Sequence, residues 1–148
     1  MATRNGIIKR TALSMYSRPR KGGIYAIEVR NEDELIQAKI SNGEQNIILA
    51  THLGKSIRFS EKNIRATGRK TMGVKGITLG SSKDKVIGML VVKREGSILV
   101  ATEKGFGKRT NLEDYREQNR GGKGVITIKT TTIVGKLIAI MEAIGSTF

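Results

Sequence analysis

The chain has 148 residues and a formal net charge of +14 at pH 7, because 27 lysines and arginines outnumber 13 acidic residues. This length suits a single domain, and so strong a positive charge favours a polyanionic partner such as nucleic acid. The absence of cysteine excludes disulfides, zinc fingers and thiol nucleophiles, and His52 is the only histidine. The longest apolar runs fall short of the roughly 20 residues that span a bilayer. The N-terminus also lacks the apolar run of a signal peptide, so we expect an intracellular protein.

The sequence contains an internal repeat of about fifty residues. The pattern Ala-Thr-x-x-Gly occurs three times, with Gly6, Gly54 and Gly105 separated by 48 and 51 residues. Each of these glycines is followed four residues later by an arginine, namely Arg10, Arg58 or Arg109. A second set of glycines, separated by 50 and 51 residues, opens a short apolar segment in each repeat: Gly23, Gly73 and Gly124. A fixed period of this length is typical of repeat architectures, and it divides the chain into repeats 2–43, 44–94 and 95–141 with a tail at 142–148.

The elements expected along the chain are short β-strands. Residues 24–29 alternate apolar Tyr25 and Ile27 with other side chains, as a half-buried strand requires. The runs 47–50 and 98–101 are apolar and stop at turn residues, and Ile126 and Ile128 repeat the alternation. The first repeat lacks a strand that would match 47–50, and only residues 111–116 favour a helical turn. Four short strands every 40–50 residues predict an all-β, propeller-like fold of about three four-stranded blades.

The basic residues gather at equivalent places in the three repeats. If the repeats pack side by side, these clusters join into a track along one rim, which would position DNA without reading its bases. The alternative is that the side chains only solvate the outer strands. The clusters are Lys9, Arg10, Arg18, Arg20 and Lys21 in the first repeat; Arg58, Lys62, Arg65, Arg69 and Lys70 in the second; and Lys108, Arg109, Arg116, Arg120 and Lys123 in the third.

One glycine-rich basic loop stands out, formed by Gln118, Asn119, Arg120, Gly121, Gly122, Lys123 and Gly124. Its glycines would expose backbone N–H groups between two basic side chains, which suits the binding of phosphate. No catalytic constellation accompanies it. His52 is expected in a turn, and Tyr16 and Tyr115 are expected to pack because isoleucine takes their place in the second repeat. We therefore expect neither enzymatic activity nor a cofactor for this chain.

The repeats resemble the C-terminal β-pinwheel of the A subunit of DNA gyrase, and residues 118–124 are similar to that family's gyrase box, Q-R/K-R-G-G-R/K-G, with Asn119 at a usually basic position. The resemblance implies a ring of blades that exchange their outer strands. It also implies a cytoplasmic, nucleoid-associated module that wraps double-stranded DNA largely irrespective of sequence. The remainder of gyrase would be its partner, and ATP and Mg would be used by other parts of that enzyme for negative supercoiling.

Several alternatives stay open from the sequence. They are a C-terminal domain of the topoisomerase IV type, a stand-alone DNA-architectural protein, and a propeller scaffold for acidic protein partners. Three repeats also cannot complete a six-bladed ring. The chain would then be half of a domain, two chains would pair as half rings, or the tail 142–148 would close a smaller ring.

Overall fold

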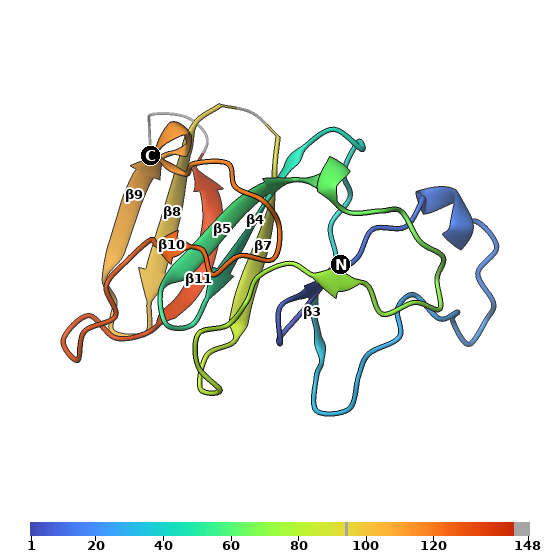
Figure 1. The fold of residues 1–148 in the computed structure, drawn as a ribbon, viewed down its shortest axis with the longest axis horizontal. Coiled ribbons are helices and arrows are strands. Elements are labelled where there is room, and N and C mark those ends of the chain that lie inside the picture. The colour runs from blue at the N-terminus through green and yellow to red at the C-terminus, as the bar shows by residue number, and fades with distance from the viewer. Residues whose placement is uncertain (94, 144–148) are drawn as a thin grey trace.

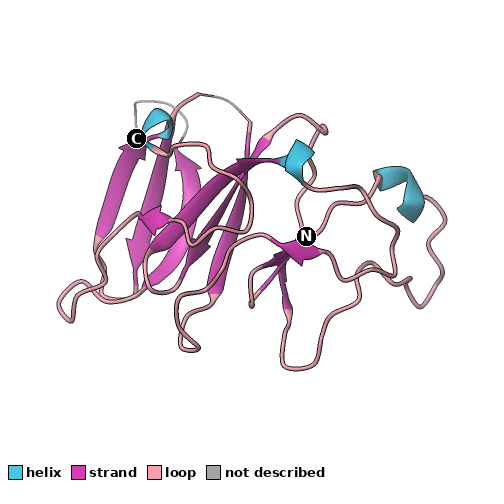
Figure 2. Ribbon diagram, viewed as in Figure 1, coloured by secondary structure: helices cyan, strands magenta, loops and turns pink. Residues whose placement is uncertain are grey.

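The computed structural model describes residues 1–93 and 95–143, and this part of the chain is all β with three short 3-10 turns (Figures 1 and 2). The turns are η1 (Leu13–Tyr16), η2 (Glu61–Asn63) and η3 (Leu112–Asp114). Within these residues no helix is long and apolar enough to cross a membrane. The all-β prediction is confirmed.

The central sheet, which we call blade 2, has the strand order β10-β5-β4-β7, with all neighbours antiparallel. Its strands are β4 (Asn46–Thr51), β5 (Lys55–Ser60), β7 (Val86–Val92) and β10 (Val125–Ile126). The run 47–50 predicted as a strand lies in the middle of β4, where it is buried on both faces. A strand covered on both faces reads as a continuous apolar run.

Blades 1 and 3 flank blade 2. Blade 1 has the order β3-β1-β2-β6, from β1 (Ala2–Thr3), β2 (Ile7–Ile8), β3 (Leu35–Gln37) and β6 (Val74–Lys75). Blade 3 has the order β11-β8-β9, from β8 (Ser97–Thr102), β9 (Gly107–Asn111) and β11 (Leu137–Ala143). The sequence predicts no strand in the first repeat to match 47–50, but β1 is present there with two residues where β4 has six. Blade 3 has three described strands instead of four.

The outer strands are exchanged between neighbouring repeats. β6 belongs to the second repeat but pairs with β2 of the first, through Ile7↔Lys75 and Ile8↔Val74. β10 belongs to the third repeat but pairs with β5 of the second, through Lys55↔Ile126 and Ser56↔Val125. Each blade is therefore completed by a segment of the next repeat, which is the arrangement that the resemblance implies.

Two apolar cores fill the spaces between the blades. Because side chains alternate across a strand, Ile47 and Leu49 of β4 face the first core while Ile48 and Ala50 face the second. The first core also holds Ile8, Phe59 and Met89, and the second holds Leu90, Ile98 and Leu137. Because β4 contributes to both cores, it packs blade 2 against blade 1 on one face and against blade 3 on the other.

Two expectations from the sequence are wrong in detail. The strand expected at residues 24–29 is not formed, and Tyr25 is 69% exposed. In the third repeat Ile126 is 62% exposed, whereas Thr127 is buried. The regular alternation fails because β10 is only two residues long, after which Thr127 N–H donates to Gly54 O at 2.8 Å and the chain leaves the sheet edge. At the other end, Glu142 pairs with Ile98 in β11, so the expected tail begins inside a strand, and its residues 144–148 lie outside the described residues.

Candidate nucleic-acid interface

Basic loops of the first and second repeats meet at an open cleft of about 940 Å³. It is lined by Arg18 and Arg20 from one loop and by Arg69 and Lys70 from the other, with Tyr25 between them. The Lys70 ammonium lies 5.6 Å from the centre of the Tyr25 ring, a cation–π geometry. Residues that are about fifty positions apart in sequence thus form one concave, positively charged surface, as the side-by-side packing of repeats predicts.

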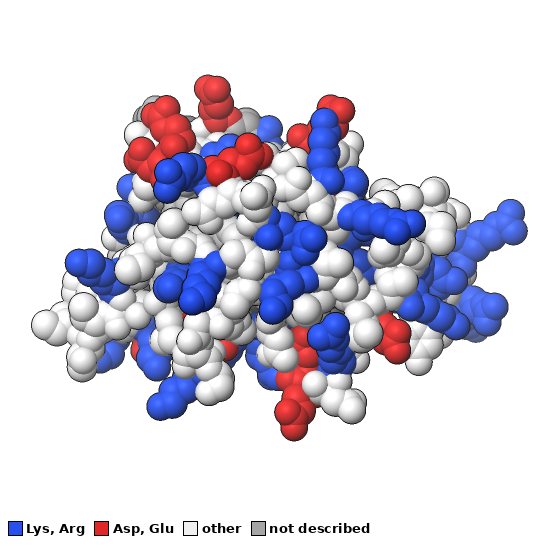
Figure 3. Space-filling model, in the orientation of Figure 1, with Lys and Arg blue, Asp and Glu red and all other residues white. Residues whose placement is uncertain are grey.

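Figure 3 shows how charged side chains are distributed over one face of the molecule. Lys and Arg side chains spread across the face from one end of the molecule to the other, while Asp and Glu side chains gather mainly near the upper and lower margins. A face with this distribution attracts a polyanion along its length and not at a single point.

Lys9 is buried and does not line the cleft. It is 2% exposed, and its ammonium donates to Ala26 O at 2.8 Å and to Arg69 O at 2.6 Å. Burial lowers the pKa of Lys9 from its ordinary value, because the charged form loses hydration. The side chain therefore ties the loops of the first two repeats together and is out of reach of a phosphate.

The repeated arginines Arg10 and Arg58 connect consecutive blades. Arg58 is fixed on its own blade by a 2.7 Å hydrogen bond from Nε to Asn46 Oδ1. Its Nη1 donates to Leu112 O and Tyr115 O, both at 3.0 Å. Leu112 begins the η3 turn of the next repeat, and Tyr115 directly follows that turn. Arg10 donates from Nε to Ile64 O, at the position equivalent to Tyr115. The same arginine in two repeats thus binds the turn of the following blade.

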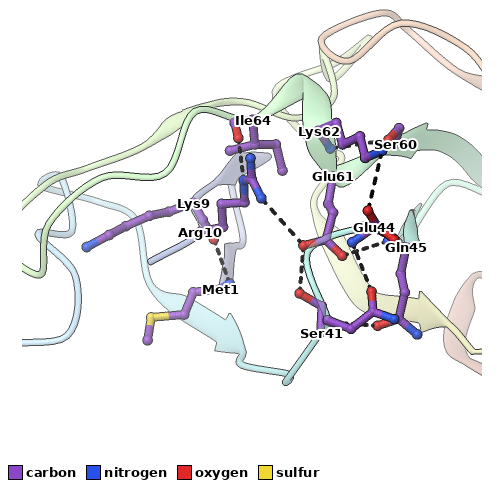
Figure 4. Close-up of polar contacts among 11 residues, drawn as sticks. Met1, Lys9, Arg10, Ser41, Glu44, Gln45, Ser60, Glu61, Lys62 and Ile64 are labelled. Carbon is purple, nitrogen blue, oxygen red and sulfur yellow. Dashed lines mark hydrogen bonds and ion pairs between the residues drawn. The ribbon is translucent and has the colours of Figure 1, made fainter. Parts of the chain in front are cut away.

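Arg10 also takes part in a buried network around Glu61 (Figure 4). The Glu61 carboxylate is 2% exposed, accepts from Ser41 Oγ at 2.7 Å and Gln45 N at 2.9 Å, and lies 3.9 Å from Arg10 Nη1. Nearby, the Met1 amine donates to the carbonyl oxygen of Lys9 at 2.9 Å. Burial, with a smaller contribution from the Lys9 charge, lowers the pKa of this amine to about 6.

The glycine-rich loop 118–124 packs against both blade 1 and blade 2. Arg120 donates from Nε to Asn63 O at 3.1 Å and from Nη1 to Lys75 O at 2.9 Å. The Gly121 N–H donates to Gly76 O at 2.8 Å. Gly124 has φ +75°, and a Cβ there would overlap Ser56 O, so only glycine allows this close approach to β5. The Arg120 side chain and the Gly121 amide thus bind within the protein, while Lys123 is exposed. Phosphate binding by this loop stays a prediction.

The other predicted residues differ in exposure. Those exposed on the surface include Arg18, Arg20, Lys21, Arg65, Lys70, Lys108, Arg109, Arg116 and Lys123. Arg109 lies on β9 and donates from Nε to Ser97 Oγ at 2.5 Å. Lys108, on the same strand, is exposed. The sequence did not distinguish contacts between blades from solvent-facing charges. The available signal was that an arginine recurs at one fixed distance from the turn glycine in every repeat.

The remaining chemistry-bearing side chains are structural. Tyr115 is buried, its hydroxyl lies 2.6 Å from Thr127 Oγ1, and burial raises its pKa. His52 lies in the turn after β4, where its backbone bonds to Lys85 O and Leu137 N. Among the described residues no cluster of three or more His, Cys, Asp or Glu side chains is arranged to hold a metal. A second cavity of about 500 Å³ has the apolar Ile8, Ile47 and Met89 in its wall.

Comparison with known proteins agrees with this architecture. The family described as the DNA gyrase C-terminal domain, a β-propeller, matches residues 1–42, 45–93 and 96–141. The chain belongs to this family. It is 40% identical to the A subunit of DNA gyrase from Haemophilus influenzae over 96% of the chain and 19% of that protein. It is 42% identical to the A subunit of DNA gyrase from a Staphylococcus aureus strain, over 97% of the chain and 16% of that protein. The chain therefore spans less than a fifth of these relatives.

Two solved structures share the fold closely. A structure of the DNA gyrase A C-terminal domain superimposes with a TM-score of 0.85 and 26% identity, covering 96% of this chain and 47% of that one. The C-terminal domain of a DNA topoisomerase IV superimposes with a TM-score of 0.87 and 27% identity, covering 96% and 45%. The chain thus spans about half of each solved domain.

Proposed function

We propose that this chain is a DNA-binding and DNA-wrapping module of a gyrase A subunit, without catalytic activity of its own. The observation that carries the proposal is the cleft in which Arg18 and Arg20 of one repeat face Arg69 and Lys70 of the next. Such a surface offers several phosphate contacts along a curved path, and phosphate contacts position DNA without specifying sequence. Membership of the gyrase C-terminal domain family supports this reading.

The basic residues divide into two roles under this proposal. The exposed residues contact phosphates: Arg18, Arg20, Lys21, Arg65, Lys70, Arg116 and Lys123. The residues bound within the protein keep the blades in the register that aligns those contacts: Lys9, Arg10, Arg58 and Arg120. Bending a 20–30 bp duplex by 40–90° costs on the order of 1–6 kcal/mol, so contacts on more than one blade must act together to offset it.

Duplex binding at varied salt tests DNA binding directly. We expect little preference for sequence, and a logarithmic salt dependence with a slope of about −0.9 for each phosphate that the protein neutralises. The double variant Arg18→Ala/Arg20→Ala should lower the affinity and make the slope shallower. The matched control is Lys83→Ala/Lys85→Ala, which removes the same charge from exposed lysines outside the cleft. Equal losses of affinity in the two double variants would refute the assignment of the cleft.

Wrapping is tested by sealing nicked circular DNA in the presence of the protein and measuring the linking number. Gyrase-like wrapping should trap positive supercoils. Binding with an unchanged linking number would instead favour a topoisomerase IV-type domain, the second candidate, which the equally good structural match supports. Displacement of duplex DNA by acidic peptides at equal concentration would favour a protein scaffold.

In the whole enzyme, we propose, the module presents bent DNA to a type II topoisomerase core in the cytoplasm, at the nucleoid. ATP and Mg would be used by other parts of that enzyme. The remainder of gyrase is then the protein partner of this chain.

A further inference from the structure

In two blades the outer strand comes from the following repeat, and we call each such strand pairing a joint. The outer edge of β9 lacks the corresponding strand among the described residues. At the edges of β2 and β5, a strand from the following repeat is added, β6 and β10 respectively. β9 holds the equivalent place in blade 3, yet the described residues provide no strand on its outer side. A groove of about 440 Å³ lies beside it, lined by Lys108 and Thr110 of β9 and by Val125 and Thr127.

The segment that would fill this place is also present in the chain. Residues 23–27 of the first repeat are equivalent to the segments that form β6 and β10, but they pair with no strand of the described residues. Figure 1 shows why they cannot reach β9 within one molecule: β9 lies at the left end, and the blue N-terminal loops lie at the right end. Within residues 1–93 and 95–143, one copy thus has an unpaired strand edge at β9 and an unpaired equivalent of β6 and β10 at residues 23–27.

The glycine that precedes each acceptor strand is closely covered in the two complete joints and open in the third. Gly6 and Gly54 have φ near +90°, and a Cβ on either would overlap the carbonyl oxygen of Ile77 or Ile128 in the next repeat. Gly105 is the equivalent residue in blade 3 and has φ +88°, but nothing lies within 4 Å of its Cβ position.

The donor side shows the same contrast. Cβ atoms on Gly73 and Gly124 would overlap the carbonyl oxygens of Ile8 and Ser56, whereas Gly23, with φ +87°, has nothing within 4 Å. Both halves of the third joint therefore keep the backbone conformation of a joint and lack the opposing strand.

We infer that the edge of β9 binds residues 23–27 of a second copy of this chain, so that two copies close into one ring. The register follows from the internal joints, in which Lys55 faces Ile126 and Ser56 faces Val125. It places Tyr25 of one copy opposite Phe106 of the other. Both aromatic side chains are exposed in a single copy, Tyr25 at 69% and Phe106 at 46%. A cross-strand aromatic pair stabilises antiparallel strands.

The difference in burial between Lys9 and Lys108 agrees with a second copy at this edge. Lys9 is covered by the next repeat through its bond to Arg69 O, but its equivalent Lys108 is exposed and lies 3.5 Å from Thr127 O. Pairing should bury Lys108 as Lys9 is buried. This inference does not depend on DNA binding.

The direct test is sedimentation equilibrium of the 148-residue chain without DNA, at about 0.15 M and about 1 M salt. Each copy carries +14, so the copies repel, and screening at high salt should strengthen pairing. We expect twice the chain mass, with the dimer fraction rising with salt, the opposite of the trend for DNA binding. A monomeric mass at both salt concentrations would overturn the inference that a second copy pairs with the β9 edge.

Cross-linking tests the register. The chain has no cysteine, so Tyr25→Cys and Phe106→Cys can be prepared separately and then mixed under mild oxidation. Opposed residues of antiparallel strands lie within the Cα range of a disulfide, so a linked dimer should form only in the mixture. A linked species in either variant alone, or none in the mixture, contradicts the register.

Gly105→Ala tests the joint without depending on the aromatic pair. In a single copy the new methyl group meets nothing, but in the joint it would overlap Ile27 O of the second copy, as the internal joints show for Gly54 and Ile128. The control is Gly43→Ala, which has φ +91°, equal free space and no place at the joint. We expect similar unfolding midpoints for both variants and at least tenfold weaker dimerisation for Gly105→Ala alone. Equal dimerisation of the two variants would overturn the inference.

Discussion

Replacing Arg58 by alanine separates the two roles of the basic residues. The substitution removes the bond from Nε to Asn46 Oδ1 and the two bonds from Nη1 to Leu112 O and Tyr115 O. A hydrogen bond from a charged group contributes about 1.5–3 kcal/mol. The side chain is half-buried and two of the bonds share one nitrogen, so we expect a loss of about 2–4 kcal/mol in the free energy of unfolding. For a chain of this size, 3 kcal/mol lowers Tm by about 6–12 °C.

The matched control for this prediction is Arg116→Ala. Arg116 is exposed and lies next to Tyr115, so its replacement removes the same charge close to the same turn. We expect a change in stability below about 0.5 kcal/mol, together with weaker DNA binding and a salt slope that is shallower by about one. Urea unfolding, calorimetry and duplex binding measure the two variants side by side. Equal stability of both variants, with the larger loss of DNA affinity in Arg58→Ala, would refute the assignment of Arg58 to the contact between blades.

Three further predictions concern the joints and the chain end. Gly54→Ala should destabilise the fold by more than about 3 kcal/mol, because its methyl group would overlap Ile128 O. The control Gly43→Ala should cost only about 1–2 kcal/mol for a left-handed backbone conformation. Comparable urea midpoints for the two variants would contradict this prediction. The Met1 amine has a folded pKa of about 6 against 8.0. Between these two pH values the unfolded state binds more protons than the folded state, so the free energy of unfolding should rise by up to about 2.7 kcal/mol from pH 6 to 8. N-terminal acetylation should abolish that rise. An unchanged pH profile of stability in the acetylated chain would exclude the amine as its source. Lys123→Gln should weaken duplex binding without changing Tm, whereas Arg120→Gln should lower Tm. The reverse pattern would exchange the roles assigned to these two residues.

The sequence determined the all-β class, the fifty-residue period and the equivalence of positions across the repeats. These features are local: the strand at 47–50 is a continuous apolar run between turn residues, and the glycines Gly6, Gly54 and Gly105 mark turns wherever they occur. The gathering of Arg18 and Arg20 with Arg69 and Lys70 was also predictable, because equivalent positions meet when repeats stack side by side.

Only the tertiary structure decided which of the repeated basic residues face solvent. Lys9, Arg58 and Arg120 have the same charge as Lys123, but carbonyl oxygens of another repeat lie within reach of the first three. Exposure likewise depends on whether a following blade covers a position, which is why Lys9 is buried and its equivalent Lys108 is not. Periodicity fixes which residues are equivalent along the chain, whereas burial depends on the neighbour that each repeat meets in space.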